Sequence, residues 1–236
     1  MSPIYVPGKV VLKKESVAAD PYYNNVSLLL HGDGTNGSTT IVDSSPSPKT
    51  VTVVGNAQIS TAQSKFGGAS ISLDGSGDAL RYASNEAFGW GTGDFTVEFW
   101  LYYQGGNGYV FFWIQAPPGP SPPYIGYGLN TGTKQPWLWN NGDILTASTS
   151  ITNNTWQHHA VVRSSGTVSI YLNGTSIGST VFAADLAASK PFSIGDNGSL
   201  TQFTLGYIDD LRITKGVARY TSNFTPPTAP FPEVWG

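Results

Sequence analysis

The sequence contains no cysteine, a single methionine and few charged side chains among its 236 residues. The absence of cysteine excludes a disulfide framework, a zinc–thiolate site and a thiol nucleophile. Charged residues make up 11% of the chain, whereas an ordinary domain has about 25%. Ser, Thr, Asn and Gly take their place, which predicts a surface of neutral hydroxyl and amide groups.

Basic runs and long apolar runs are missing as well. The formal net charge is −3 and no stretch concentrates Lys or Arg, so the sequence predicts no nucleic-acid partner. The apolar runs are short, which predicts no membrane-spanning segment. The N-terminus, from Met1 to Pro7, lacks a basic segment followed by an apolar one. No secretory signal peptide is therefore visible.

The chain does contain a succession of short apolar runs separated by Gly, Asn and Pro. In Phe95–Tyr103 every second residue is apolar, the period of a strand, and no segment keeps a helical period. This pattern predicts an all-β fold, a two-sheet antiparallel jelly-roll sandwich with almost no helix. The expected strands are 26–30, 51–54, 69–73, 79–82, 95–103, 109–115, 124–129, 136–140, 158–163, 167–173, 191–194 and 206–213, with a hairpin turn at Asn173-Gly174.

The composition divides the chain into an arm and one domain. Residues 1–24 carry several prolines and are predicted to form an extended N-terminal arm, in which Ile4 and Val6 pair as an edge strand. The alternative is a frayed terminus. Residues 25–236 have the length of a single all-β domain. They include a rigid proline-rich loop at 116–123 and end in a proline-rich tail.

Five segments in this order resemble the concanavalin A-like/laminin-G-like superfamily. The resemblance covers residues 25–232 and implies a jelly-roll sandwich that binds sugars or proteins rather than one fixed function. The segments are Lys65–Ala69 with Leu73–Gly75 and Gly77–Asp78, then Gly93–Trp100, then Trp156 with His158 and Ala160, then Ile170–Gly174, and finally Tyr207–Ile213.

A narrower resemblance is to a subfamily common in tailed-bacteriophage virion proteins. The similar segments are Leu28–His31 with Asp33–Thr35 and Asp43–Ser45, and Ile213–Tyr220 with Phe224–Pro227. The resemblance implies a structural protein of the virion: a capsid decoration, fibre or tail component. We expect it to contact other virion proteins through the N-terminal arm, to form a homo-oligomer because virion parts are multicopy, and to attach to host or surface polysaccharide. The alternative is a carbohydrate-binding module at a bacterial surface.

The sequence predicts no enzyme. Superfamily members that cleave glycans carry paired carboxylates on one face of a strand, and hydrolysis needs such a pair. Glu98 is the only acidic residue in its strand, and the adjacent Asp209 and Asp210 are expected on opposite faces. His158 is interpreted as a buried structural histidine, and no Gly-x-Ser-x-Gly nucleophile motif is present.

Calcium is the one cofactor that the resemblance implies, as a structural ion where the first and last strands meet. The matching oxygen ligands are Asp33, Asp43 and Asp209, since calcium prefers carboxylate and carbonyl oxygens. A second candidate site pairs Asp74 with Asp78. The alternative for all of these aspartates is that they cap turns through their own backbone.

Aromatic residues make up 13% of the chain, and one group suits a sugar. Trp137 and Trp139 are two residues apart, so they share a strand face, and Asn140 follows them. Tyr124 and Tyr127 lie just before this segment. Flat rings with a neighbouring amide predict a glycan-binding platform made of these five residues.

The alternative for the two tryptophans is that they face the core. Strands of this type alternate inward apolar residues, and the sequence favours this interpretation for Trp137 and Trp139. It favours it more strongly for Trp100 and Trp156.

Overall fold

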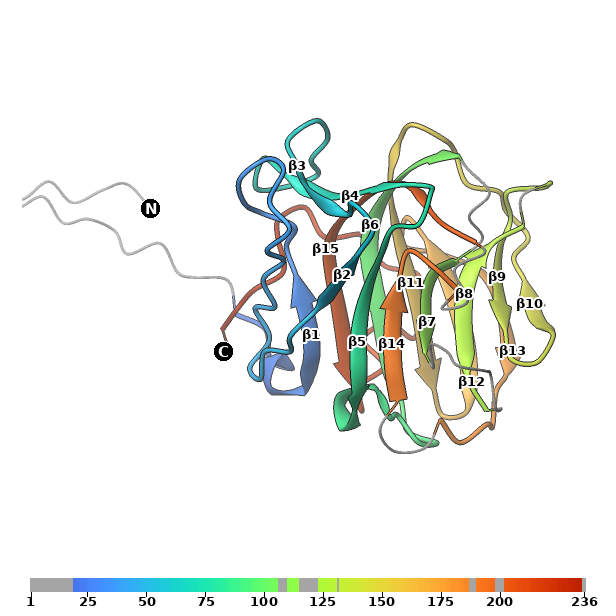
Figure 1. Ribbon diagram of the computed structural model, residues 1–236. Coiled ribbons are helices and arrows are strands. Elements are labelled where there is room, and N and C mark those ends of the chain that lie inside the picture. Colours follow the sequence, from blue (N-terminus) through green and yellow to red (C-terminus); the bar gives the residue numbers. More distant parts are fainter. Residues whose placement is uncertain are drawn as a thin grey trace, which may run out of the picture.

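The computed structural model is a β-sandwich of two layers (Figure 1) and describes residues 19–105, 110–114, 123–130, 132–186, 190–197 and 202–234. The helical elements in these ranges are the short 3-10 turns η1 (Tyr23–Asn25) and η2 (Glu86–Phe88). No helix in the described ranges has the length and apolar character needed to cross a membrane. The predicted all-β, two-sheet antiparallel sandwich is confirmed.

The two sheets have eight and seven strands in the part of the chain that is described. The order in the larger sheet is β13-β12-β11-β6-β15-β4-β3, with β1 also paired to β15. Its strands are β1 (Val26–Leu30), β3 (Gln58–Ser60), β4 (Ser70–Asp74), β6 (Phe95–Gly105), β11 (Trp156–Ser164), β12 (Thr167–Leu172), β13 (Thr175–Val181) and β15 (Leu205–Lys215).

The smaller sheet has the order β10-β9-β8-β7-β14-β5-β2 and lies in front of the larger one in Figure 1. Its strands are β2 (Thr52–Val54), β5 (Ala79–Asn85), β7 (Val110–Ile114), β8 (Ile125–Leu129), β9 (Pro136–Trp139), β10 (Asp143–Thr146) and β14 (Lys190–Ile194). All strands expected from the sequence are present with shifts at their ends. The strands not expected are β3, β10 and β13, which are polar and lie at sheet edges, where fewer apolar residues are required.

The core lies between the sheets, and β6 shows why the chain folds in this way. Phe95, Phe99 and Tyr103 belong to the main apolar cluster and are at most 4% exposed. The alternate residues Thr96 and Glu98 point to the other side of the sheet, as the strand period requires. Ile170 of β12 is also fully buried and belongs to the same cluster.

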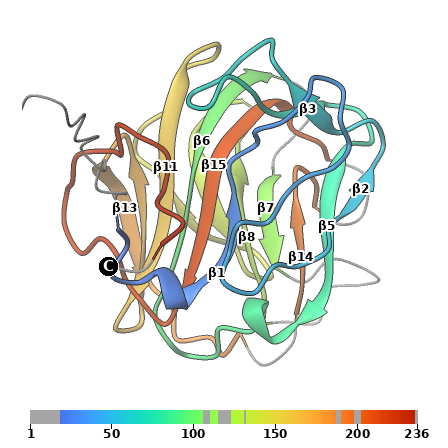
Figure 2. The same ribbon diagram turned by 90° about the vertical axis from the view of Figure 1, so that its left-hand side faces the viewer.

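The segment that follows β15, which we call the closing segment, folds back over the outer face of the eight-stranded sheet (Figure 2). Tyr220 stacks on Phe224 with ring centroids 3.5 Å apart, and the Phe224 N–H donates to the Gly174 carbonyl at 2.9 Å. Asn173 and Gly174 have positive φ values of 49° and 77°, as in the predicted hairpin turn. A Cβ at Gly174 would overlap the Phe224 carbonyl, so glycine at this position is also needed for the closing segment to pack against the turn.

The folded domain begins earlier than the predicted boundary at residue 25. Asp20 is 3% exposed, its N–H donates to the Val234 carbonyl at 2.9 Å, and its carboxylate pairs with Arg212 and Arg219. Residues 19–24 are therefore anchored to the closing segment rather than extended as an arm. Ile4 and Val6, and most of the predicted loop 116–123, lie outside the described residues.

Candidate functional site

Three aromatic side chains gather on the outer face of the seven-stranded sheet. In β9, Pro136 and Leu138 are buried, whereas Trp137 and Trp139 are partly exposed. Leu138 belongs to the main core, and the two tryptophans pack with Tyr124 in a separate cluster. We call Tyr124, Trp137 and Trp139 the aromatic platform. The interpretation that the two tryptophans face the core is wrong, because the strand period gives the inward position to Leu138.

Hydrogen bonds fix the geometry of the aromatic platform. The Trp139 Nε1–H donates to the Tyr124 hydroxyl at 3.0 Å, and the Tyr124 N–H donates to Asn140 Oδ1 at 3.3 Å. The Trp137 and Trp139 ring centroids are 5.8 Å apart, with planes at 62°. The rings therefore present two faces that meet at an angle, with the Asn140 amide at their edge.

Tyr127 does not belong to this surface, contrary to the prediction. It is fully buried, its hydroxyl bonds to His159 Nδ1 at 2.8 Å, and its ring packs edge-on against Phe99 at 6.2 Å. Tyr124 and Tyr127 are three residues apart, and an odd spacing in extended chain places side chains on opposite faces. Four of the five predicted residues thus come together, and Tyr127 supports the core.

A second aromatic group lies on the outer face of the eight-stranded sheet. Trp156 is partly exposed and packs on Tyr102 at 5.6 Å, and Tyr102 contacts Tyr207 at 6.0 Å. The prediction of a core position for Trp156 is therefore wrong. Trp100 is 6% exposed, but it also points outward and is covered by Lys65, whose Nζ lies 3.9 Å from the ring centroid.

Two of the three aspartates of the predicted calcium site are brought together. The Asp209 Oδ2 accepts N–H bonds from Lys65 and Phe66 at 2.6 and 3.1 Å, and a Cβ at the next residue of that loop, Gly67, would overlap the Asp33 carboxylate. Asp209 Oδ1 is buried and has no hydrogen-bond partner among the described residues. The pKa of Asp209 is raised to about 7, mainly by burial; the two N–H bonds oppose this rise, and Asp210 and Asp33 add to it.

Asp43 does not join this pair, contrary to the prediction. Its Oδ1 accepts N–H bonds from Leu29 and Ser45 at 3.1 and 2.9 Å, and its Oδ2 accepts one from Lys49 at 2.7 Å. Asp43 therefore anchors the loop after β1. No group of three or more His, Cys, Asp or Glu side chains with metal-site geometry occurs within the described ranges.

The second candidate pair has the alternative role in turn formation. Asp78 Oδ1 accepts from the Asn56 N–H at 2.7 Å and its Oδ2 from the Asp74 N–H at 2.9 Å. Asp74 Oδ1 accepts from the Ser76 N–H at 2.8 Å. Both carboxylates cap backbone donors of neighbouring turns, as short acidic side chains commonly do.

The expectation that Asp209 and Asp210 lie on opposite faces is wrong, and a bulge explains it. The register of β15 against β6 shifts between Asp209 and Arg212, and Asp210 has a φ of 48°. The extra residue leaves Ile208 and Leu211 facing the core and both aspartates facing outward. Asp210 then bonds to His31 Nδ1 at 2.7 Å.

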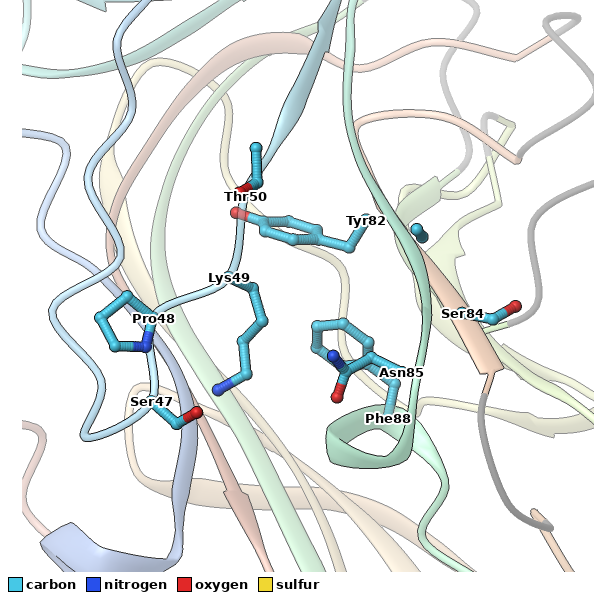
Figure 3. A pocket seen from close by; sticks show the side chains of 9 residues that line it. Ser47, Pro48, Lys49, Thr50, Tyr82, Ser84, Asn85 and Phe88 are labelled. Atoms are coloured by element: carbon cyan, nitrogen blue, oxygen red, sulfur yellow. The ribbon is translucent and has the colours of Figure 1, made fainter.

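A pocket at the sandwich edge is a feature that the sequence did not indicate (Figure 3). Its volume is about 280 Å³, and it is lined by Ser47, Pro48, Lys49, Thr50, Tyr82, Ala83, Ser84, Asn85 and Phe88. We call it the edge pocket. No motif connects residues 47–50 with 82–88, so only the folded chain shows that they meet.

The comparison with protein families is decisive for the identity of the fold. A family model described as "Concanavalin A-like lectin/glucanases superfamily" (Laminin_G_3) matches residues 74–219. The chain belongs to this superfamily. The match contains β5, both tryptophans of the aromatic platform and the Glu98 strand β6. The resemblance on which the superfamily was predicted is thereby confirmed. No curated protein matches the sequence.

Solved structures show the same superfamily fold at low sequence identity. Domain 4 of AbnA, a GH43 extracellular arabinanase from Geobacillus stearothermophilus in complex with arabinotriose, is 20% identical with a TM-score of 0.60, covering 82% of this chain and 94% of that one. The botulinum neurotoxin serotype D/C binding domain is 17% identical with a TM-score of 0.59, covering 83% and 50%. The chain thus spans about half of that binding domain.

Proposed function

We propose that this chain is a non-catalytic carbohydrate-binding protein that holds a saccharide against the aromatic platform. The observation that carries this proposal is the outward orientation of Trp137 and Trp139. Alternation along β9 places these two side chains on the outer face but does not require aromatic residues there. Indole rings offer a large apolar face to the C–H groups of a pyranose ring. A tryptophan pair with one amide beside it has the composition of a ligand site, aromatic walls with a few polar groups.

The polar groups of the platform complement sugar hydroxyls. Trp139 Nε1 and Tyr124 bond to each other and fix the ring positions, which lowers the entropy lost on binding. Asn140 Oδ1 is occupied by the Tyr124 N–H, which leaves its Nδ2 to donate to a ligand. Because the two indole planes differ by 62°, the site suits a saccharide chain that turns between residues rather than a flat surface.

Replacing Trp139 or Trp137 with alanine is expected to weaken saccharide binding by about 10-fold or more, the usual cost of removing a tryptophan hot spot. A glycan array identifies the saccharide, and calorimetry with that saccharide measures the affinity. Trp156→Ala is the matched control, since it removes a partly exposed tryptophan from the other sheet. The proposal would be overturned if both platform variants bound the saccharide as tightly as the unaltered chain, or if Trp156→Ala lost as much affinity as they did.

The environment of Glu98 supports the absence of catalysis. Its carboxylate is fully buried and bonded to Arg212 and Tyr220. Burial alone would raise the pKa of Glu98, but Arg212 and His158 together hold it well below its usual range. A permanently ionised, buried carboxylate neither donates a proton nor reaches a substrate. We expect no turnover of glycans or esters above the buffer rate.

Asp33 and Asp209 support a structural calcium ion as a further proposal. The buried Asp209 Oδ1 without a partner and the nearby Asp33 carboxylate supply two hard oxygen ligands, the kind that calcium binds. Two carboxylates repel each other when both are ionised, and a bound cation would remove this repulsion. The ion would join β15 to the loop after β1 and stabilise the folded state.

Calcium is therefore expected to raise the melting temperature relative to excess chelator. At a calcium concentration of 100 times the Kd, the stabilisation is about 2.7 kcal/mol. Asp209→Asn, which keeps the side-chain shape, should abolish the calcium-dependent shift, whereas Asp74→Asn should retain it. A shift that survives Asp209→Asn would place the ion elsewhere, and no shift in the unaltered chain would reject it.

We propose a bacteriophage virion as the setting of this binding function, with a bacterial surface as the alternative. The support is the resemblance of Ile213–Tyr220 and Phe224–Pro227 to phage members of the superfamily. In the fold these segments close the eight-stranded sheet, through the Arg219–Asp20 ion pair and the Tyr220–Phe224 stack. Mass spectrometry of purified particles tests the setting: stoichiometric copies support a virion protein, and absence from particles favours the bacterial module.

A further inference from the structure

The edge pocket exists because strand β2 is short. β2 pairs Thr52–Val54 with Ala79–Arg81 of β5, so the next residues of β5, from Tyr82 to Asn85, have the irregular loop 47–50 beside them instead of a strand. Figure 3 shows the loop on one side, with the Lys49 side chain extending along it, and Tyr82, Asn85 and Phe88 on the other. The gap between them is the pocket of about 280 Å³.

The Tyr82 hydroxyl in the wall of the pocket lacks a partner. Tyr82 is 2% exposed, and its hydroxyl has no hydrogen bond to any described residue. Figure 3 shows the hydroxyl end reaching from β5 toward Thr50. Burying an unpaired hydroxyl destabilises a fold, and native structures seldom leave one unpaired. A molecule bound in the pocket would supply the missing hydrogen bond.

Lys49 places a cation in the same pocket without an ion pair. Its side chain is half-buried, and among the described residues its Nζ donates to Ser45 Oγ at 3.2 Å. Asp43 is the acidic group that acts electrostatically on Lys49, but both Asp43 oxygens accept backbone N–H bonds. Burial lowers the pKa of Lys49, and Asp43 opposes this effect. An ammonium has three donors, so Lys49 keeps further donors for a ligand.

The groups in the pocket are mainly donors around one apolar wall. Asn85 Oδ1 accepts the Ala87 N–H at 2.9 Å, so Asn85 keeps its Nδ2 as a donor on the wall across from Lys49 (Figure 3). The Tyr82 hydroxyl lies at the Thr50 end of the pocket, and Phe88 supplies the apolar side. Such a set binds an acceptor-rich anion. The volume is slightly below the about 300–1,000 Å³ of sites for drug-sized ligands, which suits one sugar ring.

We propose that the edge pocket binds a carboxylate-bearing monosaccharide unit, a uronic acid residue. Lys49 would bind its carboxylate, and Tyr82 and Asn85 would bind its hydroxyl groups. Lys49 is the charged residue among those that line the edge pocket, so its ammonium is the group that would select an acidic sugar over a neutral one. This site is separate from the aromatic platform and does not depend on binding there.

Calorimetric titration of the full chain with glucuronate, and with glucose as the neutral match, tests the proposal. Glucuronate is expected to bind, and Lys49→Met, which keeps the apolar stem but removes the charge, is expected to weaken it by about 10-fold or more. Tyr82→Phe should also weaken binding, yet leave the melting temperature unchanged or higher, because it removes an unpaired buried hydroxyl. If the methyl glycoside of glucuronate binds as tightly as free glucuronate, the occupant is a uronic acid residue within a glycan.

Four results would overturn this inference. Three of them are equal binding of glucose and glucuronate, unchanged glucuronate affinity in Lys49→Met, and a lowered melting temperature in Tyr82→Phe without ligand. Trp139→Ala separates the two sites, since it should leave glucuronate affinity unchanged. Loss of glucuronate binding in Trp139→Ala would assign the ligand to the aromatic platform and reject the edge pocket.

Discussion

Replacing Glu98 with alanine is expected to lower the free energy of unfolding by about 3–5 kcal/mol, the cost of breaking a buried ion pair from one side. Glu98 Oε1 accepts from Arg212 Nε and Nη2 at 3.0 and 2.7 Å, and Oε2 accepts from the Tyr220 hydroxyl at 2.7 Å. Arg212 also donates from Nη1 to Asp20 Oδ2 at 3.0 Å. Loss of the carboxylate leaves the Arg212 charge buried beneath the closing segment with one remaining acid partner.

Urea unfolding measures this effect, and two further variants separate its causes. Glu98→Gln keeps the size and one acceptor oxygen, so it should cost less than Glu98→Ala. The double variant Glu98→Leu/Arg212→Met removes both charges and should be more stable than the sum of the single losses predicts. Additive losses would mean that Glu98 and Arg212 stabilise the fold independently, and would contradict the expected coupling between them.

His159 is expected to make the fold less stable in acid, beginning near pH 6.5, while Asp209, whose pKa is raised to about 7, acts in the opposite direction over the same range. This imidazole is fully buried and stacks on Phe99 at 5.4 Å with planes 7° apart. The pKa of His159 is lowered to about 3, mainly by burial and in smaller part by the neighbouring His158. Below about pH 6.5 the His159 imidazole is therefore protonated in the unfolded chain but stays neutral in the folded chain. Stability is complete above that pH and falls by about 3 kcal/mol by pH 4 from this residue alone.

Glu98 acts in the same direction at lower pH. Its pKa in the folded state is held below its usual value of 4.5, so its contribution is present above about pH 4.5 and is lost as the pH falls below it. Urea unfolding from about pH 2 to 8 measures both groups. Relative to the unaltered chain, His159→Leu should lose less stability as the pH falls from 6.5 to 4.5, whereas Tyr127→Phe, which keeps the imidazole, should show the original slope. An unchanged slope in His159→Leu would refute the assignment.

The aromatic platform shows how much of the candidate site could be predicted from the sequence. The spacing of Trp137 and Trp139 is enough to place them on one face of a strand, because side chains alternate. Which face that is depends on whether Leu138 or the tryptophans meet the opposite sheet, and both choices are apolar. The sequence favoured the wrong one, since an aromatic residue fits a core as readily as it fits a ligand surface. Tyr127 was misplaced for the same reason.

The sequence by itself determined the class of fold, the positions of most strands along the chain and the superfamily, because alternation and turn residues act locally and the five matching segments keep their order. Tertiary structure decided everything that depends on distant segments meeting. The β15 bulge turned Asp209 and Asp210 to one side, and the short β2 left the edge pocket open beside Lys49 and Tyr82. The Glu98 and Asp20 carboxylates meet Arg212 from residues 114 and 192 positions away. No local pattern encodes such contacts, because packing of the whole sandwich brings these residues together.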